Sequence, residues 1–250
     1  MPSVALPYLD HVLVDSLAIA GFARAKGSAA VPSCPGWDVI RLAGHVGRVH
    51  RMAHTSVSQQ LTSPPAADQS AKPPADPSEV ADWLARTTEA LVPVLRETAA
   101  DSPAWNFTQG PQTAAFWPRR MAHETAVHRW DADMAVNDGG AAPMDAALSV
   151  DGVDEFLSMF TRVLGSRPEA DIGGSLHLHA TDAEGEWMIE VTDGQLTVEH
   201  GHGKGDAAIR GTASDLLLGV WGRRSFLTDN CFQRFGDDEV VTSWMDLGAF

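Results

Sequence analysis

Cysteines are scarce in this sequence, long apolar runs are missing, and basic residues are few. Only Cys34 and Cys231 are present, far apart in the chain, which argues against a disulfide framework and against a Cys-x-x-Cys metal knuckle. No apolar run approaches the roughly 20 residues of a membrane span, and Asp10 stands where a signal peptide has basic residues. We therefore expect a cytoplasmic protein with two reduced thiols and no membrane partner.

The charge balance narrows the possible partners further. Eighteen Lys and Arg residues against thirty-three Asp and Glu residues give a formal net charge of −15, which repels phosphate backbones and anionic lipid headgroups. The sequence contains no local basic patch that would overcome this charge, so we expect no nucleic-acid partner. The hydrophobic fraction of 44% and the charged fraction of 20% are typical of a globular protein with a substantial core.

The N-terminal part of the chain has the apolar spacing of a helical bundle. Apolar residues recur at intervals of three and four, which predicts helices over about 4–26, 38–52, 77–99 and 117–136. The inward face of the first helix is expected to carry Leu6, Leu9, Leu13, Leu17, Ala20 and Ala23. Ser33–Gly36 is typical of a turn before the second helix, and the Pro-rich segment 61–78 is typical of an exposed loop. Four long helices predict a four-helix bundle.

The C-terminal part changes from helical to alternating periodicity. A fifth helix over about 144–164 is followed by strands at 176–180, 187–191, 195–199 and 207–211 and a helix over 216–221. Asp193–Gly194 is typical of a hairpin turn between the second and third strands. We expect a small α+β domain with an antiparallel sheet, and hence two domains, residues 1–140 and 141–250.

A candidate metal site begins with Glu124 and His128, four residues apart in the predicted helix 117–136. Side chains at this spacing lie on one helix face. The second helix offers three histidines as a third ligand, and His45 shares the apolar side of that helix, whereas His50 and His54 lie roughly 140° and 180° from it. We therefore favour His45, Glu124 and His128 as metal ligands.

The sequence H-E-T-A-V-H at 123–128 does not form the zinc motif of metalloproteases, because His123 lies roughly 140° from His128 around the helix axis. Glu124 is then a ligand and not a general base. The spacing alone does not separate a metal site from a weak surface ion pair, which also occurs at four-residue intervals. Three protein ligands would leave one position open on zinc, as catalysis requires.

Other histidines and aromatic residues have simpler interpretations. His177 and His179 share one face of a predicted strand, but no third ligand is evident nearby, so we expect a packed or solvent-facing strand. His200 and His202 are assigned to a flexible glycine-rich loop. Trp37, Trp117 and Trp130 are expected to pack the bundle, where they could also line a cavity beside the metal.

Two motifs resemble the mycothiol-dependent maleylpyruvate isomerase family. V-P-S-C-P-G-W-D-V-I-R-L-A-G-H at 31–45 is similar to the family's C-x-G-W…L…H segment, and R-R-M-A-H-E-T-A-V-H-R-W-D-A-D at 119–133 is similar to its E-x-x-x-H helix. The resemblance implies a DinB-like four-helix bundle in which His45, Glu124 and His128 bind the metal. It also implies a sterol-carrier-like α+β fold for the C-terminal domain.

The same resemblance implies an activity and its cofactors. Zn²⁺, or another divalent metal, would bind the thiolate of mycothiol, which would add to the cis double bond of maleylpyruvate and leave again after rotation. Relatives transfer mycothiol to another electrophilic small molecule, and a non-catalytic binding or regulatory module is a further alternative. Arg223 or Arg224 is expected to bind a substrate carboxylate, while Trp37, Trp117 and Arg120 are expected near the thiol cofactor.

Overall fold

The chain folds into two compact units. The computed structural model describes residues 6–66, 72–137, 140–164, 174–192 and 195–247. The units are Met1–Ala142 and Pro143–Phe250, a division close to the domain boundary expected at residue 140. Within the described residues, every helix is either too short or too polar to span a bilayer.

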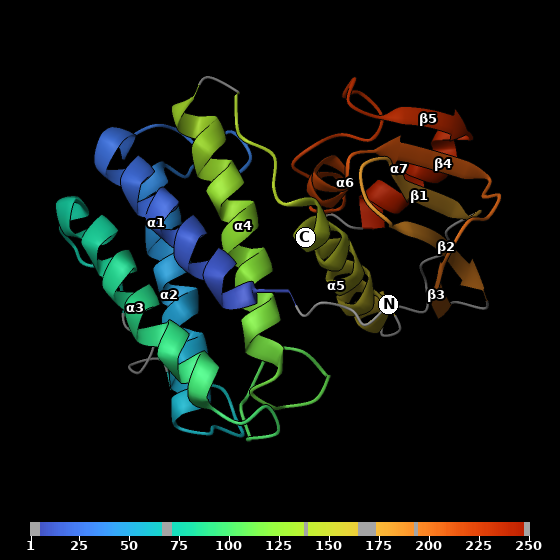
Figure 1. Cartoon of the computed structure of the whole chain (residues 1–250). Helices are drawn as coiled ribbons and strands as arrows, with labels where there is room; N and C mark the ends of the chain where they lie inside the picture. Colours follow the sequence, from blue (N-terminus) through green and yellow to red (C-terminus); the bar gives the residue numbers. More distant parts are fainter. Residues whose placement is uncertain (1–5, 67–71, 138–139, 165–173, 193–194, 248–250) are drawn as a thin grey trace. The chain divides into compact units, whose positions relative to one another are not determined.

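The first unit is a bundle of four helices, as predicted. They are α1 (Tyr8–Lys26), α2 (Val39–Ser58), α3 (Val80–Glu97) and α4 (Phe116–Val136), with a 3-10 turn, η1 (Pro77–Glu79), leading into α3. Helices α1 and α2 each pack against both α3 and α4, as Figure 1 shows. The core between them is formed by small and branched apolar side chains, including Ile19, Leu42, Val46 and Leu84.

A tight turn fixes the chain just before α2, where the sequence predicted one. The backbone N–H of Trp37 donates to the carbonyl of Cys34 at 3.0 Å, and Gly36 has a φ of +79°, a left-handed conformation that glycine adopts without steric cost. Asp38 then caps the helix, because its carboxylate accepts a hydrogen bond of 2.7 Å from the backbone N–H of Arg41. The turn therefore sets the position from which α2 starts.

The inward face of α1 differs in part from the predicted one. Ala20 and Ala23 are buried as expected, but Leu17 is 46% exposed, while Val12 and Ile19, which lie outside the predicted stripe, are buried. This helix carries apolar residues on all sides, so that more than one stripe has the three- and four-residue spacing. Packing against α3 and α4 determines which stripe is buried. The sequence of α1 alone does not contain this information.

The second unit is an α+β domain, as predicted. Helix α5 (Ala146–Leu164) precedes a five-stranded sheet of order β3-β2-β1-β4-β5. The first four strands are β1 (Leu176–Ala180), β2 (Glu186–Thr192), β3 (Gln195–His200) and β4 (Ala207–Gly211), and α6 (Ala213–Val220) follows them. Strand β5 (Gln233–Gly236) and helix α7 (Asp238–Leu247) were not predicted. The predicted Asp193–Gly194 turn lies outside the described residues.

The expectation of a purely antiparallel sheet is wrong, because the sheet is mixed. Strand β1 pairs antiparallel with β2 but parallel with β4. The segment 201–206, which we call the crossover, therefore runs from the end of β3 back to the start of β4. The parallel neighbours β1 and β4 are joined through β2 and β3, so they have the long connection that parallel strands usually need. The alternating periodicity predicted the strands but not which of them pair.

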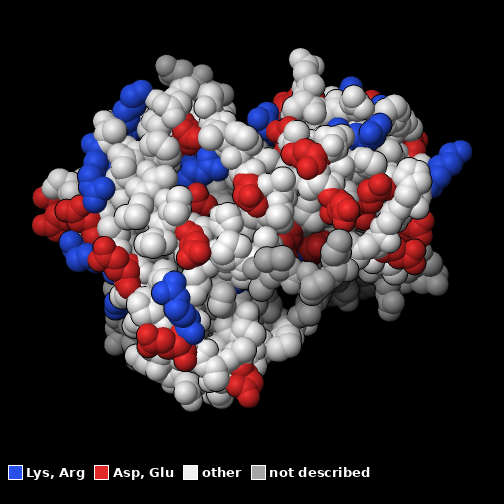
Figure 2. All heavy atoms as spheres, in the orientation of Figure 1, with Lys and Arg blue, Asp and Glu red and all other residues white. Residues whose placement is uncertain are grey.

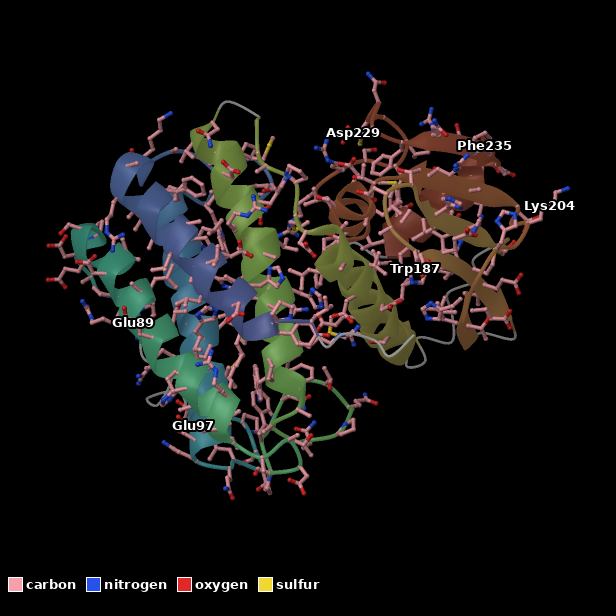
Figure 3. All side chains as sticks on the ribbon, in the orientation of Figure 1. Glu89, Glu97, Trp187, Lys204, Asp229 and Phe235 are labelled. Atoms are coloured by element: carbon pink, nitrogen blue, oxygen red, sulfur yellow. The ribbon has the colours of Figure 1, made fainter. Side chains whose placement is uncertain are left out.

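The two faces of the sheet have different coverings. Trp187, whose indole N–H donates to Asp154 Oδ1 of α5 at 2.5 Å, faces the helices of this unit, and Figure 3 shows its side chain beside α5. Met188, the next residue of β2, points to the opposite face, where a Cβ added at Gly203 of the crossover would come within 2.7 Å of its side chain. The crossover therefore lies on the face opposite the helices.

Two glycines of the bundle provide a matched test of its packing. A Cβ added at Gly47 of α2 would lie 2.2 Å from Cζ3 of Trp83 in α3, whereas one added at Gly21 of α1 meets nothing within 4 Å. We expect Gly47→Ala to lower the free energy of unfolding by about 1–3 kcal/mol through overpacking. Gly21→Ala should raise it by about 0.5–1 kcal/mol, because alanine favours helix. Urea denaturation of both variants checks this, and equal effects of the same sign would contradict it.

Candidate metal centre

The three side chains expected to bind metal converge between α2 and α4. His45 Nε2 lies 3.0 Å from Glu124 Oε1, and His128 Nε2 lies 3.4 Å from the same oxygen. The ring centroids of His45 and His128 are 5.0 Å apart. Zinc binds nitrogen and oxygen at 2.0–2.2 Å in a tetrahedron, which places ligand atoms about 3.3 Å from one another. The spacing of these donor atoms therefore fits a zinc ion.

A buried carboxylate orients one of the imidazoles. The Nδ1–H of His128 donates to Asp131 Oδ2 at 3.0 Å, and the hydroxyl of Ser33 donates to Asp131 Oδ1 at 2.5 Å. The Asp131 side chain is fully buried. A proton held on Nδ1 leaves the lone pair of Nε2 free for a metal, which is the usual arrangement of a histidine ligand and its supporting carboxylate. Asp131 was not predicted as part of the site, although it lies one helical turn after His128.

Cys34 also lies beside this carboxylate, with Sγ 3.8 Å from Asp131 Oδ2. Its Sγ, a ring nitrogen of His128 and a carboxylate oxygen of Asp131 all lie within 4.8 Å of one another. The interpretation of Cys34 as a structural thiol stays a prediction.

The charges at the cluster are strongly coupled. Burial raises the pKa of Glu124, but hydrogen bonds with His128 and His45 and the charge of Arg120 outweigh burial and hold it well below its usual value. Arg120 Nη2 donates to Glu124 Oε2 at 2.9 Å. Burial lowers the pKa of His128, but hydrogen bonds to Asp131 and Glu124 outweigh burial and raise it to about 9. Without metal, His128 and Glu124 therefore form an ion pair at neutral pH.

His50 has a structural role in the same helix as His45. Its ring is fully buried, with Nδ1 3.1 Å from Thr88 Oγ1 of α3 and Nε2 3.0 Å from Thr125 Oγ1 of α4. Burial lowers its pKa to about 4, so the ring is neutral and links three helices. Among the described residues of the bundle, the groups of side chains close enough to share a metal ion include none of His50, His54 and His123.

A pocket of about 340 Å³ adjoins the cluster through His45, which is part of its lining. Trp37 also lines it, with its ring centroid 5.0 Å from that of His45 and 6.3 Å from that of His128. Arg41 and Arg48 complete the polar part of the lining, and the Arg41 guanidinium lies 5.3 Å from the centre of the Trp37 ring. An aromatic wall with two cations suits a small anionic ligand.

Trp117 and Arg120, the other residues expected near the thiol cofactor, both lie in α4. Trp117 is fully buried, packs edge-on against Phe107 and Phe116, and donates its indole N–H to the carbonyl of Trp105 at 3.1 Å. Arg120 is buried beside Glu124. The assignment of Trp117 and Arg120 to the thiol cofactor stays a prediction.

Arg223 and Arg224 lie just after α6 in the second unit. Arg223 Nη1 donates to the carbonyl of Trp221 at 2.9 Å, and Arg224 Nε lies 2.9 Å from Asp215 Oδ1. Each guanidinium thus has a partner within its own unit. Their expected role in binding a substrate carboxylate stays a prediction.

The expectation that no further ligand lies near His177 and His179 is wrong. Glu186 of β2 and His202 of the crossover lie beside them, and one potential ligand atom from each of the four residues falls within 4.8 Å of the others. These two residues have no spacing signal in the sequence, because strand pairing brings Glu186 to the histidines of β1 and the crossover brings His202 to them.

Together, the fold and the site define a class of protein: a helical bundle with a His-Glu-His cluster, followed by a separate α+β domain. The family model for the mycothiol maleylpyruvate isomerase N-terminal domain matches residues 16–133, and the model for the MDMPI C-terminal domain matches residues 147–242. The chain therefore belongs to the mycothiol-dependent maleylpyruvate isomerase family.

Solved structures show the same fold at low sequence identity. A crystal structure of the mycothiol-dependent maleylpyruvate isomerase is 14% identical, with a TM-score of 0.57 over 92% of this chain and 93% of that one. A histidine-to-alanine mutant of that enzyme is also 14% identical, with a TM-score of 0.55 over the same shares. No curated protein matches the sequence.

The raised pKa of His128 predicts how metal binding depends on pH. A metal at Nε2 must displace the proton that His128 holds up to a pKa of about 9, so we expect the zinc affinity of the metal-free protein to rise about tenfold per pH unit below pH 9. Asp131→Asn should weaken zinc binding about 10–100-fold and shift this dependence to lower pH. Competition with a chromophoric chelator at several pH values measures both effects. An affinity that does not change between pH 7 and pH 9 would contradict the assignment of His128.

Proposed function

We propose that this protein is a zinc-dependent enzyme that uses mycothiol to isomerise the cis double bond of maleylpyruvate or a similar small acid. The observation that carries the proposal is the convergence of the His45 and His128 rings on one carboxylate oxygen of Glu124, beside a cationic pocket. Three protein ligands leave a position on zinc for a fourth. Membership in the isomerase family supports a thiol as the group that takes this position.

His45, Glu124 and His128 would hold the metal. Zinc bound there would supply the Lewis acidity that favours the thiolate of mycothiol, which would offer a nucleophile for reversible addition to the double bond. The same sulfur would be the entering and the leaving group, so the isomerisation would need no further reactant.

The side chains around the cluster have separate tasks in this proposal. Asp131 keeps a proton on Nδ1 of His128, which directs Nε2 to the metal. Arg120 offsets the charge of Glu124, so that the carboxylate remains ionised although it is buried. Trp37 covers both imidazole rings and limits the access of water. Arg41 and Arg48 orient the carboxylates of an anionic substrate or cofactor.

Substitution of the ligands tests the proposal. We expect His45→Ala and Glu124→Ala to lose one bound zinc ion and to reduce kcat/KM for maleylpyruvate, assayed with mycothiol, by more than about 100-fold, because even the partners of metal ligands contribute 10–100-fold. His54→Ala, a matched histidine of the same helix outside the cluster, should keep both metal and rate.

The outcomes of this assay are distinct. A zinc-loaded wild-type protein that converts no maleylpyruvate in the presence of mycothiol would overturn the isomerase proposal. Consumption of the thiol by another electrophile, abolished in the same variants, would then identify a mycothiol S-transferase. Unchanged zinc content in His45→Ala and Glu124→Ala would refute the metal centre itself.

Substitution of Arg41 tests the proposed role of the pocket in binding anions. We expect Arg41→Gln to raise KM for the anionic substrate or for mycothiol about tenfold, with a smaller change in kcat, because a charge-assisted hydrogen bond contributes about 1.5–3 kcal/mol. The exposed Arg96 of α3 lies outside the pocket lining, so Arg96→Gln is the matched control. Steady-state kinetics measure both constants. Identical KM values for the two variants would contradict the proposal that the pocket binds the anion through Arg41.

A further inference from the structure

The second unit contains a cluster of three histidines and one glutamate that the proposed function does not use. His177 and His179 are two residues apart on β1, so both point to the same face of the sheet. Glu186 of β2 is the register partner of His179 in the antiparallel pair, which brings its carboxylate to that face. His202 arrives from the crossover, which lies over the same face. Strand pairing and crossover thus bring together four side chains from three segments.

The four side chains are directed at one another. Glu186 Oε2 lies 3.1 Å from His177 Nε2 and 2.9 Å from His202 Nδ1, and its Oε1 lies 3.2 Å from His179 Nδ1. The ring centroids of His177 and His202 are 5.4 Å apart, and those of His177 and His179 are 6.0 Å apart. Three imidazole nitrogens therefore surround one carboxylate at the spacing seen in the bundle cluster, where the corresponding distances are 3.0 and 3.4 Å.

We propose that His177, His179, Glu186 and His202 form a second metal site that binds zinc as a structural ion. Imidazole and carboxylate together are a donor set that zinc prefers. Four protein ligands complete a tetrahedron and leave no position for a substrate, which is the mark of a structural site. The site lies within the second unit and does not depend on the function proposed for the bundle.

The arrangement of the crossover suggests a structural role for such an ion. The end of the crossover is already anchored, because Asp206 Oδ2 accepts hydrogen bonds from the backbone N–H and the hydroxyl of Ser175 at 2.8 and 2.9 Å. Its first half carries His202, whose side chain is 81% exposed. Lys204 between them points away from the sheet, as Figure 3 shows. A bond from His202 to an ion held by β1 and β2 would fasten the exposed half of the crossover to the sheet.

A nearby histidine outside the cluster serves as the control. His200 ends β3 and is 67% exposed, with Nε2 3.7 Å from Asp154 Oδ1 of α5. It lies two residues before His202 but is absent from the metal-capable group. A surface that binds zinc through any exposed histidine would respond equally to the loss of either residue, whereas the proposed site responds only to the loss of His202.

Metal content tests the proposal directly. The full-length, untagged protein is dialysed against buffered zinc, and bound metal is measured by mass spectrometry. We expect two zinc ions per chain in the wild type and in His200→Asn, but one in His179→Asn and in His202→Asn. Glu124→Ala should lose the other ion and keep this one, so the two sites are counted separately. One ion per chain in the wild type, lost in Glu124→Ala, would show that the second cluster is only an ion-pair network.

Proteolysis tests the structural task of the ion. Trypsin can cleave after Lys204 only when the crossover detaches from the sheet by local unfolding. Zinc should therefore slow this cleavage more than about tenfold in the wild type and in His200→Asn. In His202→Asn, zinc should leave the rate unchanged. Circular dichroism confirms that the variants are folded. Equal protection of all three proteins, or protection of none, would overturn the proposed clamp.

Discussion

The structure of the bundle depends on keeping one largely buried carboxylate charged, that of Glu124, whose side chain is 19% exposed. Removing an ionised carboxylate from water costs several kcal/mol unless partners surround it, and Glu124 has His45, His128 and Arg120 as partners. Two of these side chains come from α4 and one from α2. The helices must therefore lie side by side at this level of the bundle, so that the interaction which would bind metal also fixes the packing of the fold.

The same requirement extends into the rest of the unit. His128 is held by Asp131, and Asp131 is held by Ser33 in the turn before α2, so the turn that starts α2 is tied to α4. His50 links α2 to threonines of α3 and α4. Buried polar groups that are fully hydrogen-bonded favour one arrangement over others. Polar contacts of this kind position the site more strictly than its apolar neighbours can.

In the face shown in Figure 2, charged residues are dispersed and the basic ones do not merge into one patch.

Much of the fold and of the cluster could be predicted from local spacing. The four-residue interval placed Glu124 and His128 on one face, and the apolar side of α2 selected His45 over His50. These inferences need only the geometry of one helix. Asp131 could have been found in the same way, as a carboxylate one turn from a histidine ligand.

The features that were missed depend on contacts between distant segments. The inward face of α1 is chosen by its neighbours, since the helix is apolar on every side. The parallel pairing of β1 with β4 depends on a crossover that leads from β3 past β2 and β1 to β4. Glu186 and His202 became visible beside His177 only once that topology was known. A cluster assembled by strand register has no spacing signature along the chain, whereas one assembled on a helix does.

The number of protein ligands distinguishes the roles proposed for the two clusters. Zinc with two neutral imidazoles and one carboxylate retains a net charge of about +1, and Arg120 beside Glu124 adds a further positive charge. An incoming thiolate would therefore be attracted to the bundle cluster, where its binding would neutralise the ion. In the sheet cluster a third imidazole takes that position and brings no charge, so the ion would keep its charge on the surface of a chain whose formal net charge is −15. In the two proposed sites, the same ion would thus favour an anionic cofactor in one unit and a closed structural clamp in the other.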